Sequence, residues 1–93
     1  MTYSEIRMLI DAALASIPRL QDCRREVRDE ALLCSLDRQA VAISPSGPTG
    51  ILVRYFTGES TVHARIFAAS PLSVDRIAHT AAEHLTAYTF HRT

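Results

Sequence analysis

The first stretch of the chain has the hydrophobic spacing of an amphipathic helix. Its apolar residues recur three or four positions apart, as on one face of a helix; they are Ile6, Leu9, Ile10, Ala13, Leu14 and Ile17. Thr2 and Glu5 have the spacing of a capping box, in which each side chain bonds the backbone amide of the other residue. Pro18 has no amide hydrogen to donate and interrupts the pattern. The sequence therefore predicts a helix that begins near Thr2 and ends before Pro18.

The segment that follows, from Arg19, is open to two interpretations. Its apolar residues fit one side of a second helix; they are Leu20, Cys23, Val27, Ala31 and Cys34. On such a helix the two cysteines would lie about 16 Å apart, beyond the reach of a disulfide. In the competing interpretation, Leu32, Cys34 and Leu36 alternate along a strand that ends in a turn. We expect the helix, with both cysteines as buried thiols.

From Ala40 the period of the pattern changes to two, which predicts three strands. The alternating residues are Val41 and Ile43, then Ile51, Val53 and Tyr55, then Val62, Ala64, Ile66 and Ala68. Proline and glycine in Ser44–Gly50 indicate a loop between the first two strands. Gly58 stands at the first central position of a two-residue type II′ turn between the last two. That turn sets Tyr55 opposite Val62 and gathers the apolar side chains of both strands on one inner face.

A last helix is predicted from Pro71 to about Phe90, with Asp75 in its first turn. Its apolar stripe consists of Val74, Ile77, Ala78, Ala81, Leu85 and Tyr88. The predicted order is thus α-α-β-β-β-α. An antiparallel three-stranded meander with helices packed on one face makes a two-layer α+β domain. We expect residues 1–93 to form a single globular domain.

The same hairpin register predicts a second sheet face that carries candidate partner-binding residues. Arginine and aromatic residues, which are enriched at protein interfaces, alternate on this face, and Arg54 lies opposite His63. The candidates are Leu52, Arg54, Phe56, His63, Arg65 and Phe67. A second candidate set lies on the exposed side of the expected second helix and consists of Arg24, Arg25 and Arg28.

Charge and composition exclude several classes of function. Ten arginines and no lysine stand against ten acidic residues, so the formal net charge is zero. Without lysine there can be no Schiff-base chemistry and no phosphate-loop lysine. Zero net charge removes the overall attraction that a general duplex-DNA binder needs. Charged residues interrupt the start of the chain, and proline and glycine break its longest uncharged run, so we expect a cytoplasmic protein that does not contact membranes.

The residues that could carry catalysis or bind a metal form no recognisable motif. His79 and His84 are five residues apart and diverge by about 140° on a helix, whereas zinc helices place two histidines four residues apart. The cysteines and serines occur in no nucleophile motif. We therefore expect no enzyme activity, no metal and no cofactor.

These observations favour a small non-enzymatic protein-interaction module. Such a module would be an adaptor, a chaperone-like subunit, or an inhibitor of the phage or antagonist type that docks on a larger macromolecule. Its expected partner is another protein or protein complex, and self-association as a homodimer is an open alternative. Single-stranded nucleic-acid binding through the Arg/Phe sheet face is less favoured. A small enzyme or metal-binding domain is the least favoured alternative.

Overall fold

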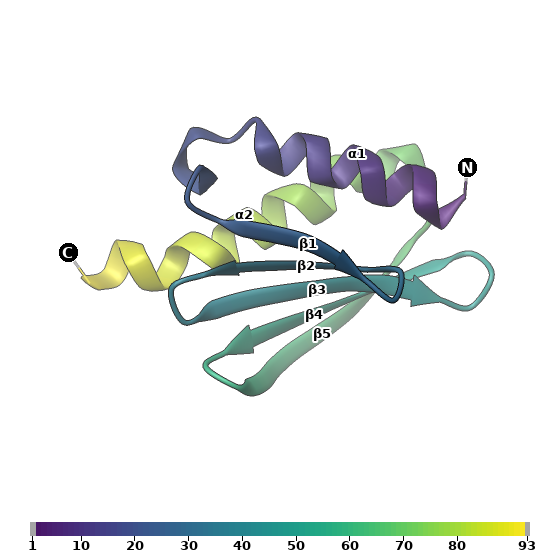
Figure 1. The fold of residues 1–93 in the computed structure, drawn as a ribbon. Coiled ribbons are helices and arrows are strands. Elements are labelled where there is room, and N and C mark those ends of the chain that lie inside the picture. The colour runs from purple at the N-terminus through teal and green to yellow at the C-terminus, as the bar shows by residue number, and fades with distance from the viewer. Residues whose placement is uncertain (1, 93) are drawn as a thin grey trace.

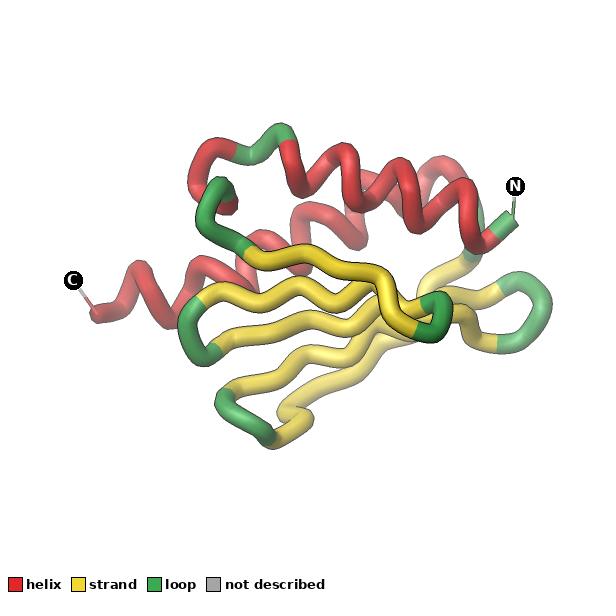
Figure 2. Tube along the Cα trace, in the orientation of Figure 1, coloured by secondary structure: helices red, strands yellow, loops and turns green. Residues whose placement is uncertain are grey.

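The chain forms a five-stranded antiparallel sheet with two helices packed on it. The computed structural model describes residues 2–92, with side chains described for residues 2–86. The elements are α1 (Tyr3–Ala15), a 3-10 turn η1 (Pro18–Leu20), β1 (Arg24–Arg28), β2 (Ala31–Leu36), β3 (Gln39–Ser46), β4 (Gly50–Thr57), β5 (Ser60–Ala68) and α2 (Pro71–Arg92) (Figure 1). The strands lie in the order β1-β2-β3-β4-β5, so each pairs with the next along the chain. Figure 2 shows both helices on the same side of the sheet.

The first helix begins where the sequence predicts. The Thr2 hydroxyl accepts a hydrogen bond from the Glu5 amide at 3.2 Å, and the Glu5 carboxylate accepts one from the Thr2 amide at 3.3 Å. These two bonds complete the capping box. The pKa of the Glu5 carboxyl is lowered because the Thr2 amide and the Thr2 hydroxyl, the latter at 3.1 Å, both donate to the carboxylate and favour its charged form. The prediction of this helix is confirmed.

The predicted second helix is wrong, because its residues form the hairpin of β1 and β2. In this hairpin Arg24 pairs with Ser35 and Arg28 with Ala31. The turn residues Asp29 and Glu30 both have positive φ, 50° and 71°, the conformation that matches the twist of a tight hairpin. Such turns usually contain glycine, and none is present here, so the sequence carries no turn signal at this point. The order α-α-β-β-β-α and the count of three strands are therefore also wrong, although the α+β class is confirmed.

The competing interpretation of this region, a strand with alternating Leu32, Cys34 and Leu36, is confirmed by β2. Its consequence for the cysteines is large. Cys23 and Cys34 do not lie on one helix about 16 Å apart. Cys23 immediately precedes β1, which pairs with β2, and both cysteines belong to the same buried cluster.

The register between β4 and β5 also differs from the prediction. Thr57 faces Ser60 across the Gly58 turn as expected, but an irregularity follows and Tyr55 pairs with His63 instead of Val62. The extra residue is Val62, so every later side chain of β5 points to the opposite face from the one predicted. The physical reason is that β5 is an edge strand whose residues from Ser60 to Ile66 are all exposed. Burial does not fix its register, and bulges are common at such edges.

The core lies between the helices and one face of the sheet. Helix α1 contributes Ile6, Ile10 and Leu14, which are completely buried. Helix α2 contributes Val74, Ile77, Ala78, Ala81, Ala82 and Leu85. The sheet contributes Leu32, Cys34, Val41, Ile43, Ile51, Val53 and Tyr55. The predicted apolar stripe of the last helix is confirmed up to residue 85, and Tyr88 lies outside the residues whose side chains are described.

The predicted loop between β3 and β4 is shorter than Ser44–Gly50, since pairing continues to Ser46 and resumes at Gly50. A Cβ atom at Gly50 would lie 2.5 Å from the backbone oxygen of Ser46. We expect Gly50→Ala to lower the free energy of unfolding by about 1–3 kcal/mol, because backbone must move to admit the methyl group. Urea denaturation measures this change. The exposed neighbouring substitution Thr49→Ala should change stability by less than about 0.5 kcal/mol, and equal effects of the two would contradict the close approach.

Candidate interaction surface

The face of the sheet opposite the helices is uncovered. Strand pairing carries one row of side chains from Leu33 on β2 through Ala42 on β3 to Arg54 on β4. A parallel row joins Leu52 on β4 to Ile66 on β5. These residues alternate with those of the core, so they point away from both helices. We call the set Leu33, Ala42, Leu52, Arg54, Phe56 and Ile66 the open sheet face.

The open sheet face is apolar over most of its width. Ile66 is 68% exposed, and Val62 in the adjacent bulge is 57% exposed. Leu33, Leu52 and Phe56 are half-buried by their neighbours, and the small Ala42 side chain among them is only 3% exposed. Single exposed apolar residues are ordinary, but a contiguous group on an uncovered sheet is typical of a surface that binds another molecule.

The charges on and beside this face are mainly positive. The Arg54 guanidinium carbon lies 5.8 Å from the centroid of the Phe56 ring, within the range of a cation–π contact. At the β1 end, Arg28 forms an exposed ion pair with Glu26 at 3.3 Å. Among the described residues, neither Arg24 nor Arg54 has a carboxylate partner. The face therefore offers two uncompensated guanidinium groups beside an apolar centre.

A depression of about 250 Å³ lies where the open sheet face meets β1. It is lined by Arg24, Arg25, Glu26, Leu33 and Ser35. Because charged groups surround Leu33 there, the depression can receive a side chain that has both an apolar part and a polar end.

The six residues predicted to share one face are divided between two. Leu52, Arg54 and Phe56 lie on the open sheet face. The inverted register of β5 places His63, Arg65 and Phe67 on the helix side of the sheet, at its edge. The prediction that all six form one surface is wrong, because of the bulge at Val62. Their role in binding is not decided by this geometry and stays a prediction.

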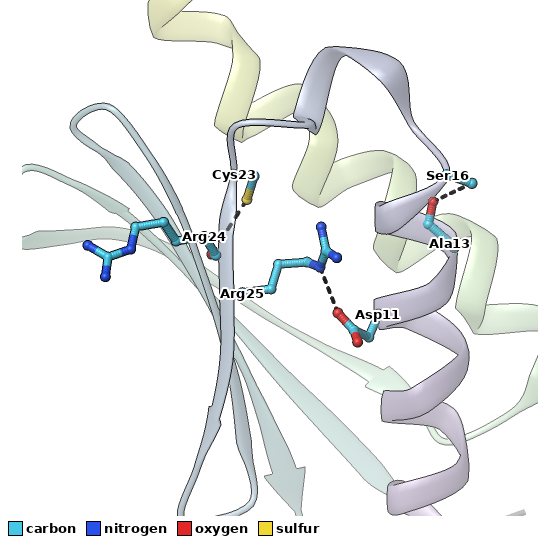
Figure 3. A network of polar contacts seen from close by, with 6 residues as sticks. All are labelled: Asp11, Ala13, Ser16, Cys23, Arg24 and Arg25. Atoms are coloured by element: carbon cyan, nitrogen blue, oxygen red, sulfur yellow. Dashed lines mark hydrogen bonds and ion pairs between the residues drawn. The ribbon is translucent and has the colours of Figure 1, made fainter.

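The second predicted set is divided in the same way. Arg24 and Arg28 lie on β1, where strand alternation turns them toward the open side. Arg25 points toward the helices, and its Nε donates a hydrogen bond to Asp11 Oδ1 of α1 at 2.8 Å (Figure 3). Arg25 therefore joins the sheet to the helix layer, and only the other two arginines are placed to meet a partner on the open side.

Three members of the open sheet face are not among the predicted binding residues. Leu33 falls within the span of the expected second helix, Ile66 lies on the inner face predicted for its strand, and Ala42 lies on no predicted surface. The alternation of β2 contained the signal for Leu33. No signal in the sequence marks the bulge that turns Ile66 outward.

A second, shallow pocket of about 310 Å³ opens between β4, β5 and α2. It is lined by Tyr55, His63, Thr80, Glu83 and His84. The His63 ring stacks on Tyr55 with centroids 5.2 Å apart, and His84 Nε2 lies 2.8 Å from the Phe56 carbonyl oxygen. Burial raises the pKa of the Tyr55 phenol. The pocket thus has hydrogen-bonding groups and one carboxylate but belongs to the helix side, apart from the open sheet face.

The histidines of the last helix make separate contacts. His79 Nε2 pairs with Glu83 at 2.5 Å on the exposed side of α2. His84 Nε2 instead forms a hydrogen bond with the backbone carbonyl oxygen of Phe56 on β4. This agrees with the divergence predicted from their spacing. In the described part of the chain, no three His, Cys, Asp or Glu side chains are grouped so that they could hold a metal ion.

Comparison with known proteins gives no family for this chain. No protein-family model, curated protein or solved structure matches it. Within residues 2–92, neither helix combines the length and apolar character that crossing a membrane requires.

Proposed function

We propose that this protein is a small non-enzymatic interaction module that docks on another protein through its open sheet face. It would act in the cytoplasm as an adaptor, a chaperone-like subunit or an inhibitor. The observation that carries the proposal is the helix-free sheet surface on which Ile66 is 68% exposed beside Leu52 and Phe56. Apolar groups in this arrangement gain free energy when a partner removes them from water.

The charges define the chemistry of the partner. Arg24 and Arg54 would lose hydration on docking, so the partner must supply carboxylates opposite them. Forked contacts between guanidinium and carboxylate groups would also fix the orientation of the complex. The matching surface is therefore apolar at its centre with Asp or Glu side chains around it.

A second copy of this chain is a poorer match. In a two-fold contact the same face meets itself, so the unpaired arginines of one copy would approach those of the other. The only acidic residue on the open side of β1 is Glu26, which already pairs with Arg28. Like charges without compensation oppose such a dimer, and we expect the partner to have a different sequence.

Single-stranded nucleic-acid binding was suggested by an Arg/Phe face shared by two strands, and the two strands do not share that face. Arg54 and Phe56 lie on one side of the sheet, and Arg65 and Phe67 lie on the other. A row of bases stacks on one continuous platform, and these two Arg/Phe pairs cannot form one together.

Two arginines on neighbouring strands give a matched test of the docking face. Both Arg54 and Arg65 are exposed, and each guanidinium lies over a phenylalanine ring, at 5.8 and 5.0 Å. They differ in the side of the sheet on which they lie. We expect Arg54→Glu to weaken partner binding at least tenfold, about 1.4 kcal/mol, and Arg65→Glu to leave it unchanged.

The measurement needs an identified partner. A photo-crosslinking residue at position 52 would capture proteins that touch the open sheet face in the host cell, and titration calorimetry with the purified partner would give affinities for wild type and both variants. Thermal unfolding checks that both variants fold. Equal losses for both arginines, loss only with Arg65→Glu, or capture of nucleic acid alone would contradict the proposal.

A further inference from the structure

The two cysteines lie side by side on neighbouring strands. Arg25 pairs with Cys34, and Cys23 lies two residues before Arg25, so both cysteine side chains project from the helix side of the sheet as diagonal neighbours. Cys23 is 9% exposed and Cys34 is 1% exposed. Both are free thiols. One thiol therefore lies at the edge of the core and the other inside it.

The surroundings make the two thiols chemically unequal. The neighbouring Cys34 side chain lowers the pKa of Cys23, and the Ser35 backbone and the Arg25 cation lower it further, against the effect of burial. The same interaction raises the pKa of Cys34, and burial and the Asp11 carboxylate raise it too. The pair thus gives up its first proton at Cys23 and keeps the second on Cys34.

The charged groups around the pair come from both layers. Arg25 on β1 carries the positive charge, and Asp11 on α1 holds it in place at 2.8 Å (Figure 3). The Cys23 thiol itself donates to the Arg24 carbonyl oxygen at 3.6 Å. A thiolate at Cys23 would thus lie beside a cation whose position is fixed, and nearby positive charge is one of the features of reactive cysteines.

We propose that Cys23 and Cys34 are a reactive dithiol that low-molecular-weight disulfides oxidise to an intramolecular disulfide, with Cys23 as the attacking sulfur. The Cys23 thiolate attacks one sulfur of the small disulfide, forms a mixed disulfide and releases one thiolate. Cys34 then loses its proton to that thiolate or to water and attacks the Cys23 sulfur, which displaces the second thiolate. The two cysteines lose two electrons and two protons, and one small disulfide becomes two thiols. This modification site is independent of the docking face.

The test is oxidation of the full-length reduced protein with oxidised glutathione, followed by alkylation with iodoacetamide and intact mass spectrometry. We expect a product that is lighter by two hydrogens, carries no glutathione and no alkyl group, and remains monomeric. Its melting temperature should rise by at least about 5 °C, since the new bond closes a loop in the unfolded chain. Reduction with dithiothreitol should restore the original mass.

Single-cysteine variants assign the roles. Cys34→Ser should accumulate a mixed disulfide with glutathione at Cys23, whereas Cys23→Ser should not react until denaturant exposes Cys34. Cys34→Ala and Cys23→Ala repeat the comparison if a serine variant unfolds. The proposal is wrong if the wild-type protein ends with two glutathiones, forms intermolecular dimers, or keeps both thiols. Binding to the partner is measured separately under reducing conditions. A negative result for the dithiol can therefore be distinguished from a negative result for the docking face.

Discussion

Replacing Leu32 with alanine is expected to lower the free energy of unfolding by about 3 kcal/mol, whereas Leu33→Ala lowers it by less than about 1 kcal/mol. The two leucines are adjacent on β2 but point to opposite faces. Leu32 is 1% exposed and belongs to the core cluster, so its truncation leaves a cavity between sheet and helices. Leu33 is half-buried on the open sheet face, where water can occupy the vacated space. Urea denaturation of the three proteins gives the comparison.

The pair also separates stability from binding. Leu33→Ala should weaken the partner complex while the fold remains intact. Leu32→Ala should leave the affinity of the folded fraction unchanged. Equal destabilisation by both substitutions would mean that both faces of β2 are covered, and would remove the basis for the open sheet face.

Replacing Leu20 with alanine is expected to cost a similar amount, about 3 kcal/mol. Leu20 is the buried residue of η1, with no exposed surface, and its carbonyl oxygen accepts a hydrogen bond from the Cys23 amide at 2.9 Å. Its side chain therefore fixes the segment that carries Cys23 into β1. Besides the loss of stability, we expect faster alkylation of the two cysteines by iodoacetamide at neutral pH.

The neighbouring exposed residue provides the control. Arg19→Ala changes a side chain on the surface of the same turn and should alter neither the unfolding free energy by more than about 0.5 kcal/mol nor the alkylation rate. If Leu20→Ala unfolds with the wild-type free energy, η1 is not part of the core and the position of Cys23 depends on β1 alone.

The elements that could be predicted from the sequence are those whose local signals agree with their burial. The capping box at Thr2 and Glu5 and the three-four spacing of Ile6 and Ile10 both mark α1, and the structure uses both. The hairpin of β1 and β2 was not predictable in this way. Its turn consists of Asp29 and Glu30, side-chain-bearing residues in a left-handed conformation that the surrounding strands impose. Without a turn signal, the apolar residues of this segment fit a helix equally well.

The part of the candidate surface on β4 could be predicted from the sequence, and the part on β5 could not, because burial fixes the orientation of only the first strand. On β4, buried Val53 and Tyr55 fix which way Leu52, Arg54 and Phe56 point, so alternation alone gave the correct side. On β5 no residue from 60 to 66 is buried. Both faces of that strand are therefore similar in energy, and one extra residue at Val62 was enough to exchange them. The cysteine pair depended on the same missing turn, since its proximity exists only when β1 and β2 are strands.

The strand order has a consequence for how the chain finds this fold. Because each strand pairs with its neighbour in sequence, every step of the sheet closes only a short loop, which costs little chain entropy. Helices α1 and α2 flank the sheet in the sequence yet pack against each other. The packing of α1 on α2 brings together residues from the two ends of the chain. The fold therefore combines local contacts within the sheet with one set of contacts between residues far apart in sequence. We therefore expect the joining of the two ends to cost more chain entropy than the closing of any single hairpin of the sheet.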